Sequence, residues 1–343
     1  MGDDTTEKSM TTHRMLKRLF IAIGFSAVCG QGWAQDAFMG EYEGTYHADQ
    51  SQTTKATAKV IAEGPNYYRV VVMAEPLQAS EPTAQFEIYG VRQGDQVNLF
   101  GRANAEMWHG TIAGDRLVAD PGYYGLSLEL KKITRTSPTE GAPPPAGAVV
   151  LLPFAPGKAP DLSAWNENQW KPLDDGSLQC NPGKGSITTK QRFGDMKLHV
   201  EFWLPLMAEH FGQERANSGV FLNNLYEIQV LDSFGLVPTM GDCAAIYSQT
   251  RPRVNANLPP EHWQTYDITF RAPRMNPDGS VKEKARVTVE FNGIKVQDNT
   301  IIEGCTLGHE PGKPPANAAT GPLQLQDHGN LARFRNIWLV ELK

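Results

Sequence analysis

Apolar and polar residues alternate in short runs along most of this chain, and turn-forming residues separate the runs. Successive side chains of an extended strand point to opposite faces, so such alternation predicts strands with one buried face. Long stretches with apolar residues three and four positions apart, which would predict amphipathic helices, do not interrupt the pattern. We therefore predict an all-β protein.

Eight strand-like runs follow one another before residue 136. Gly94-Asp95 and Gly114-Asp115 separate two pairs of these runs and are typical of tight hairpin turns. Consecutive short strands with tight turns predict a meander that curls into a small barrel or sandwich. The predicted strands are Tyr42 to Tyr46, Thr57 to Ala62, Tyr67 to Met73, Phe86 to Val91, Val97 to Gly101, Met107 to Ile112, Leu117 to Ala119 and Leu126 to Ile133.

The aromatic residues of this first region allow two interpretations. We expect them mainly to fill the core and edges of the small domain, and the alternative is a surface on which sugar rings stack. The residues concerned are Tyr67, Tyr68, Trp108, Tyr123 and Tyr124.

A change of composition divides the chain. Residues Thr136 to Ala148 (TSPTEGAPPPAGA) contain three consecutive prolines among small residues, which form neither helix nor sheet ladders. We predict a semi-rigid extended spacer here, between a small accessory domain at 35–135 and a second domain at 149–343. A chain of 343 residues also exceeds the usual size of one domain.

The second region is again rich in strand-like runs. About ten to twelve such strands predict a sandwich of two sheets with one polar, concave face. Asn292-Gly293 is a strong hairpin signal between two of them. In the last strand we expect Phe334, Trp338 and Val340 on one face and the two arginines on the other. The clearest runs are Lys197 to Trp203, Thr265 to Arg271, Arg286 to Phe291, Ile294 to Gln297 and Arg333 to Val340.

Two runs place polar, chemically capable side chains at every second position. Tyr226 to Val230 presents Glu227 and Gln229 opposite an apolar face, and Leu323 to His328 presents amides and the histidine in the same way. A polar ligand such as a sugar suits this face, and a solvated sheet surface is the alternative. The predicted groove combines Glu201, Asn217, Glu227, Gln229, Gln326, Asp327, His328 and Arg333.

Glutamate and histidine act as general acids or bases when their pKa values are tuned towards neutrality. A direct glycosidase requires two carboxylates, but the strand that carries Glu227 has Gln229 where a second one would stand. Glu201 or Asp327 would have to supply it. Glu227, Asp327 and His328 could also hold a divalent cation, although no HExxH-type motif supports a metal site.

Charge and the N-terminus restrict partners and location. A net charge of -6 argues against nucleic acid or an anionic membrane as partner. Basic residues up to Arg18 precede the apolar run Leu19 to Val28, which predicts a signal peptide cleaved after Ala34 and a periplasmic or secreted protein. Cys180, Cys243 and Cys305 then remain, either as buried thiols or as one disulfide with one unpaired thiol.

From about Leu151 to Lys343 the chain resembles the bacterial 3-keto-disaccharide hydrolase family, and the resemblance does not extend to residues 35–135. Several long motifs in the right order carry it. They are ITTKQRFGDMKLHVEFWLP (187–205), ANSGVFLNNLYEIQVLDSFG (216–235), GDCAAIYSQTRPRVNANLPPEHWQTYDITFRAP (241–273), ARVTVEFNGIKVQDN (285–299) and GPLQLQDHGNLARFRNIWL (321–339).

The resemblance implies a concanavalin-like jelly roll that cleaves glycosides already oxidised at C3. A C3 ketone acidifies the proton at C2, so a single base, Glu227 or His328, could start elimination of the group at C1. The remaining polar residues would hold hydroxyls. A noncatalytic lectin-like module and an ordinary glucanase-type glycosidase are the alternatives.

Overall fold

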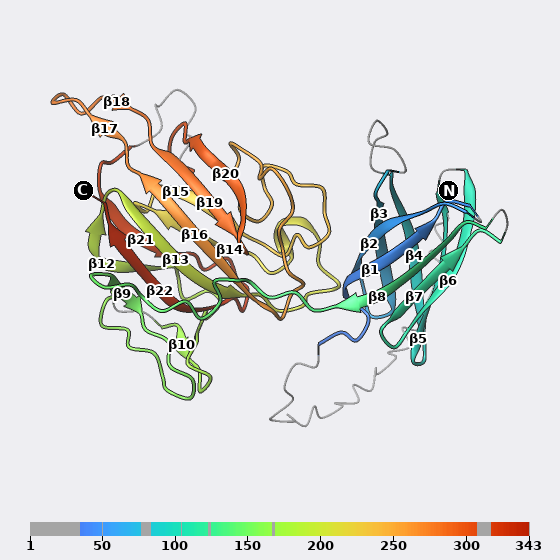
Figure 1. Ribbon diagram of the computed structural model, residues 1–343. Coiled ribbons are helices and arrows are strands. Elements are labelled where there is room, and N and C mark those ends of the chain that lie inside the picture. The colour runs from blue at the N-terminus through green and yellow to red at the C-terminus, as the bar shows by residue number, and fades with distance from the viewer. Residues whose placement is uncertain are drawn as a thin grey trace, which may run out of the picture. The chain divides into compact units, whose positions relative to one another are not determined.

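The first part of the described chain forms a closed barrel of eight antiparallel strands, in which each strand pairs with the next and β1 pairs with β8 (Figure 1). The computed structural model describes residues 35–49, 51–76, 84–103, 105–122, 125–166, 169–306 and 317–342. The predicted signal peptide lies outside these residues. The strands are β1 (Gly40–His47), β2 (Thr53–Ala62), β3 (Tyr67–Ala74), β4 (Ala84–Gln93), β5 (Gln96–Ala103), β6 (Glu106–Ala113), β7 (Arg116–Asp120) and β8 (Ser127–Ile133).

All eight strands predicted before residue 136 are confirmed, because alternation and turn chemistry agree throughout this region. Gly94 and Gly114 adopt φ values of +66° and +58° in the β4–β5 and β6–β7 turns, which side chains with a Cβ rarely accept. Tyr68 and Trp108 are buried in the barrel, as expected of core aromatics, whereas Tyr67 is exposed. The two remaining tyrosines, at 123 and 124, lie outside the described residues.

The second part of the chain forms two main antiparallel sheets and a short β-ribbon. The larger sheet has the order β10-β11-β22-β13-β16-β19-β20, with β9 also paired to β22, and the smaller has the order β12-β21-β14-β15. The elements are β9 (Val149–Leu152), β10 (Lys171–Pro172), β11 (Leu178–Gln179), β12 (Ile187–Phe193), β13 (Met196–Trp203), a 3-10 helix η1 (Gly212–Glu214), β14 (Ser218–Leu222), β15 (Tyr226–Val230), β16 (Trp263–Arg271), β17 (Arg274–Met275), β18 (Val281–Glu283), β19 (Arg286–Phe291), β20 (Ile294–Ile301), β21 (Gly321–Leu325) and β22 (Arg333–Glu341).

One apolar core is shared by the two sheets. Val200 of β13 and Tyr266 of β16 enter it from the larger sheet, and Ile228 of β15 and Leu325 of β21 enter it from the smaller one. Burying one face of each sheet against the other is the reason for the alternation seen in the sequence. The all-β jelly-roll prediction, with a small barrel before it, is confirmed.

The predicted facing of β22 is wrong in its second half, because the strand contains a β-bulge. Arg335 pairs with Glu201 and Trp338 pairs with His199, so two residues of β22 lie opposite one residue of β13. Asn336 at this point adopts a left-handed conformation with φ +47°. The bulge moves Ile337 into the core and turns Trp338 to the outer face of the larger sheet.

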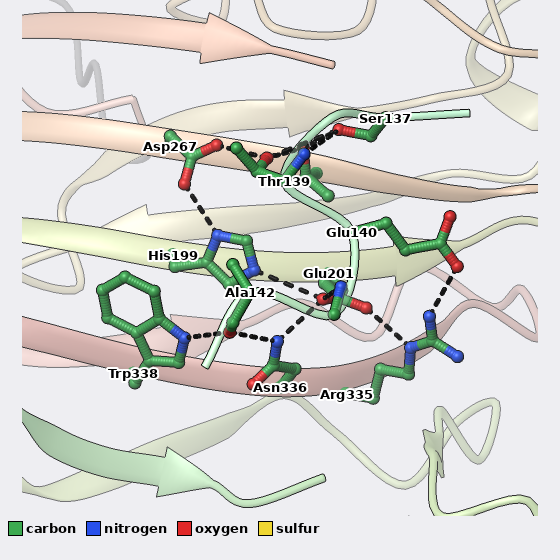
Figure 2. Close-up of polar contacts among 12 residues, drawn as sticks. Ser137, Thr139, Glu140, Ala142, His199, Glu201, Asp267, Arg335, Asn336 and Trp338 are labelled. Atoms are coloured by element: carbon green, nitrogen blue, oxygen red, sulfur yellow. Dashed lines mark hydrogen bonds and ion pairs between the residues drawn. The ribbon is translucent and has the colours of Figure 1, made fainter. Parts of the chain in front are cut away.

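The bulge helps to assemble a buried polar cluster on that outer face (Figure 2). Glu201 is completely buried there and accepts hydrogen bonds from Arg335 Nε at 2.7 Å and Asn336 Nδ2 at 2.8 Å. Burial raises the pKa of a carboxyl group, but hydrogen bonds from His199, Asn336 and Arg335 outweigh this effect and lower the pKa of Glu201. The glutamate is therefore held as a paired anion.

His199 is the second buried titratable group of the cluster. Its Nδ1 lies 2.7 Å from Asp267 Oδ1 and its Nε2 lies 3.4 Å from Glu201 Oε1, while its ring stacks on Trp338. Burial disfavours the protonated imidazole, but the hydrogen bonds to Asp267 and Glu201 outweigh it and raise the pKa of His199. The two carboxylates thus favour the protonated form of His199, which lies between them.

The start of the proline-rich segment is docked on this cluster and does not act as a free spacer. Gly141 N donates to Glu201 Oε1 at 2.6 Å, and Ala142 O accepts hydrogen bonds from the side chains of Asn336 and Trp338 (Figure 2). Thr139 Oγ1 donates to Asp267 Oδ2 on β16 at 2.7 Å. The change from barrel to sandwich strands falls within this segment, between Ile133 and Val149.

The three cysteines that follow the predicted cleavage site are buried thiols, and no disulfide joins them. The first of the two sequence interpretations therefore applies. Within the described part of the chain, no helix is both long and apolar enough to cross a membrane.

The raised pKa of His199 predicts how the stability of the fold depends on pH. Its folded-state pKa is raised, so its contribution is complete below the unfolded pKa of about 6.5 and is lost as pH rises through the folded value. Replacement His199→Gln should therefore lower the free energy of unfolding more at pH 6 than at pH 9, as measured by denaturant titration. The exposed His109 provides the control, since His109→Gln should have a small effect at every pH. Parallel pH curves for wild type and His199→Gln would contradict the assignment.

Candidate functional site

Strand β15 carries the central residues of the site, Glu227 and Gln229. Tyr226, Ile228 and Val230 point into the core, so the glutamate and the glutamine lie on the outer face of the smaller sheet. Both are nevertheless buried, with 3% and 1% exposure. The interpretation of this face as a solvated surface is therefore wrong for β15.

The backbone of β15 is hydrogen-bonded along both edges. Glu227 pairs with Phe221 of β14 on one side, and on the other side its carbonyl accepts a hydrogen bond from Tyr247 N. Gln229 exchanges backbone hydrogen bonds with Ala244 and Ala245 on that same side. Residues 244–247 thus satisfy the backbone groups along the second edge of β15.

The carboxyl group of Glu227 has an unusual electrostatic environment. Burial raises the pKa of Glu227 from 4.5 to about 8, and burial is the sole cause of the shift. No charged group among the described residues is a cause of this shift. A carboxyl group with a pKa near neutrality can gain or lose a proton under physiological conditions, as general acid–base catalysis requires.

Gly219 allows Glu227 and Gln326 to lie close together. A Cβ atom on Gly219 would lie 2.5 Å from Glu227 Oε1 and 3.2 Å from Gln326 Oε1, and the first contact is not sterically allowed. Gln326 N also donates to Gly219 O at 3.0 Å, which fixes the end of β21 beside β14. The glycine in the middle of a strand therefore permits the close approach of two polar side chains.

Two side-chain oxygens near this point lack protein donors. Gln326 Oε1 and Asn217 Oδ1 are buried, and neither accepts a hydrogen bond from a described residue. Buried polar atoms are normally hydrogen-bonded, because an unpaired one costs roughly 1–3 kcal/mol. Together with the carboxyl group of Glu227, these oxygens form a set of acceptors suited to hydroxyl groups of a ligand.

His328 lies in the loop after β21 and is exposed, and no described contact joins it to Glu227. The same loop does reach β14, because Asn330 Oδ1 accepts a hydrogen bond from Asn217 N at 2.6 Å. The structure thus brings the two sequence motifs of the predicted site together, but His328 itself is exposed in the loop.

Asp327 has a structural environment. Its carboxylate accepts hydrogen bonds from the backbone N–H groups of Gly185 and Gly329, both at 2.9 Å. Burial opposes ionisation, but these hydrogen bonds outweigh it and lower the pKa of Asp327. Its acceptors are used in holding two turns, so it does not supply the second carboxylate considered from the sequence.

Glu201 and Arg333 are not part of this group, which corrects the predicted groove. Both lie on strands of the larger sheet, and Glu201 belongs to the outer-face cluster described above. Arg333 stacks over Trp203, with 4.3 Å between its Cζ and the ring centroid, and donates to Gln179. Alternation predicts which face of a strand is polar, but it cannot tell which of two sheets the strand joins.

Within the described ranges, no three His, Cys, Asp or Glu side chains are grouped so that they could hold a metal ion. The trio of Glu227, Asp327 and His328 considered from the sequence does not converge.

Sequence reasoning missed Gly219 and Gln213. A glycine inside an alternating run is a recognised signal of close approach, so Gly219 could have been found. Gln213 lies in η1, outside any periodic pattern, and donates to Gly241 O while accepting from two amides of the site. No local signal marks such a residue.

The sandwich is similar to known proteins in sequence and in structure. The model of the 3-keto-alpha-glucoside-1,2-lyase-like domain family matches residues 148–340, which is more than half of the chain. The chain belongs to this family. The matched range of the 3-keto-alpha-glucoside-1,2-lyase-like domain includes both sheets of the sandwich and all the residues of the site, and it excludes the barrel.

One solved structure supports the same assignment. A crystal structure from Parabacteroides distasonis ATCC 8503, provisionally assigned as a glycosyl hydrolase, is 38% identical with a TM-score of 0.52, and the match covers 58% of this chain and 85% of that one. A second such structure from the same organism is 17% identical with a TM-score of 0.40, over 55% of this chain and 92% of that one, which is too distant to inform function. No curated protein matches. The family and the first structure support an enzyme that acts on glycosidic bonds.

Because Glu227 is buried without a charged partner, we expect its ionised form to destabilise the fold. Because its pKa is raised, ionisation favours unfolding, and stability is lost as pH rises from the unfolded pKa near 4.5 to the folded pKa near 8. Glu227→Gln should therefore become more stable relative to wild type across this range, by at most roughly 5 kcal/mol at pH 8 and above. Denaturant titrations between pH 5 and 9 measure the difference.

Glu201→Gln is the matched control for this prediction. Glu201 is also buried, but its pKa is lowered, so its ionised form stabilises the fold above the unfolded pKa. This variant should be less stable than wild type at neutral pH. A stability difference for Glu227→Gln that does not vary with pH would rule out the raised pKa.

Proposed function

We propose that this protein is an exported enzyme that cleaves the glycosidic bond of 3-keto-glycosides, and that Glu227 is the base that starts the reaction. The observation that carries the proposal is the buried Glu227 carboxyl group, which no charged group among the described residues pairs or neutralises. Export rests on the N-terminal sequence alone.

The proposed reaction needs one base. The C3 ketone acidifies the C2–H bond, and Glu227 takes that proton. The electron pair of the C–H bond forms an enolate, and its collapse makes the C1–C2 double bond and expels the aglycone oxygen from C1. The leaving oxygen takes up a proton and departs as the free alcohol. Addition of water across the double bond then gives the free 3-keto sugar, so that the sum is hydrolysis.

Three arguments favour this chemistry over hydrolysis by two carboxylates. Burial alone sets the pKa of Glu227, and an ionised carboxylate nearby would have contributed to it. A desolvated carboxylate of raised pKa is a stronger base than one in water. The family description also names a 1,2-lyase, and elimination between C1 and C2 is a reaction of that kind.

Asn217 and Gln326 are proposed to bind substrate hydroxyls through their unpaired oxygens. His328 is proposed to protonate the leaving oxygen, because it is exposed to solvent in the loop that directly follows Gln326. Gln229 is proposed to support the site, since its amide nitrogen is used in hydrogen bonds with Gln213 and Gly241.

Activity on paired substrates tests the proposal. Wild type should release the aglycone from a chromogenic 3-keto-glucoside and not from the corresponding unoxidised glucoside, because only the ketone acidifies C2–H. Glu227→Gln should lower kcat by at least roughly 100-fold, the usual contribution of a general base, while sugar affinity changes little. Equal release from both substrates would instead show an ordinary glycosidase, and binding without turnover would show a lectin-like module.

The pH profile tests the role of Glu227 separately. A base must be ionised, so kcat/KM should rise with pH and level off above about 8, the pKa of Glu227. Single-turnover measurements from pH 5.5 to 9.5 would record the profile. Activity that falls through pH 8 would show that Glu227 acts as an acid and overturn its assignment as the base.

A further inference from the structure

Gln213 joins the two amide side chains that flank the site. Its Oε1 accepts hydrogen bonds from Gln229 Nε2 at 2.9 Å and from Asn217 Nδ2 at 3.1 Å. Its Nε2 donates to Gly241 O at 2.8 Å, so the donor and the acceptor ends of the Gln213 amide cannot be exchanged without loss. One side chain of η1 thus fixes the orientation of two others.

The orientation of Asn217 follows from these contacts. Its Nδ2 donates to the side chain of Gln213 and, at 2.8 Å, to the Gln213 carbonyl, so its Oδ1 must point the other way. This Oδ1 is buried and accepts no hydrogen bond from a described residue. Asn217 directly precedes β14 and stands two residues before Gly219, whose missing side chain leaves room for Glu227 Oε1. The unpaired oxygen therefore belongs to a residue at the end of β14 that adjoins Gly219.

The segment that carries Gln213 is itself held in place. Arg215 Nε donates to Asp232 Oδ2 at 2.7 Å, and both side chains are buried. Asp232 follows β15 by two residues, so the ion pair joins the end of η1 to the strand that bears Glu227. Gln213 is only partly buried, yet it is fixed to the rigid part of the site from two directions.

We infer that Gln213 is a positioning residue, which locks Asn217 with its carbonyl oxygen towards the substrate and so makes the site select a free ring hydroxyl. The inference rests on the proposed function for the identity of the substrate, but the amide network does not depend on it. If Asn217 rotated by 180° about χ2, it would present an NH2 donor instead. A site of unpaired acceptors should exclude sugars in which the facing hydroxyl is removed or methylated, because the buried oxygen would then have no partner.

Two replacements of Gln213 separate positioning from folding. Gln213→Met has similar length and removes both the acceptor and the donor. Gln213→Glu keeps an acceptor for Asn217 and Gln229, and it replaces the donor to Gly241 with a second carboxylate oxygen and a negative charge. The neighbouring exposed Glu214 has no side-chain contact among the described ones, so Glu214→Met controls for a disturbance of η1.

The first readout is substrate selectivity. We compare kcat/KM for a 3-keto-glucoside with that for its 4-deoxy, 6-deoxy and O-methyl analogues. Wild type, Gln213→Glu and Glu214→Met should discriminate against at least one analogue, and Gln213→Met should lose roughly tenfold or more of that discrimination, mainly through a higher KM for the parent substrate. Unchanged selectivity in Gln213→Met would overturn the inference.

The second readout does not need activity. The side-chain NH2 groups of Asn217 and Gln229 should exchange slowly with solvent by 15N NMR in wild type and Gln213→Glu, and faster in Gln213→Met. If wild type does not cleave 3-keto-glycosides but the exchange pattern holds, the proposed function fails and the positioning role stands. If wild type is active and exchange in Gln213→Met is unchanged, the positioning role fails alone.

Discussion

The shared apolar core of the sandwich is the constraint on which the remaining structure depends. Each sheet must turn one face to the other, so every second residue of β13, β15, β16 and β21 is committed to the interior. The polar residues between them are thereby placed on outer faces in fixed registers. Both polar centres of the sandwich, the outer-face cluster around Glu201 and the site around Glu227, arise in this way on opposite sheets.

The two centres show how a fold gives one residue type opposite properties. Glu201 and Glu227 are both buried, but the first receives hydrogen bonds from Arg335, Asn336 and Gly141, while no charged group contributes to the pKa of the second. Burial acts in the same direction on both pKa values. Paired donors reverse it at Glu201, and their absence leaves it in force at Glu227. A buried glutamate with hydrogen-bond donors stabilises the fold. A buried glutamate without them lowers stability, and a role in catalysis would explain why it is kept.

Segments outside the two main sheets complete both polar centres. The segment Ser137–Ala142 donates hydrogen bonds to Glu201 and to Asp267, although the proline-rich composition of 136–148 predicts only a spacer. On the other sheet residues 244–247 pair with the edge of β15, and Gln213 of η1 accepts hydrogen bonds from the amides of Gln229 and Asn217. These segments have no periodic pattern, because their contacts are made residue by residue with strands far away in the sequence. The match to the family begins at 148, so the segment Ser137–Ala142 is supplied from outside the matched domain.

The sequence by itself determined the strands and the faces of most of them. Local alternation predicts all eight barrel strands and the inward residues of β13, β15 and β16. This is possible because alternation of apolar and polar residues is enough to identify a strand with one buried face. Glu227 could be selected in the same way, as a charged residue between apolar neighbours. Only the tertiary structure decided that Glu201 and Arg333 belong to the other sheet, that a bulge at Asn336 reverses the facing of Trp338, and that Glu227 is buried. Strand partners and covering loops decide these points, and contacts between residues distant in the chain leave no trace in a local pattern.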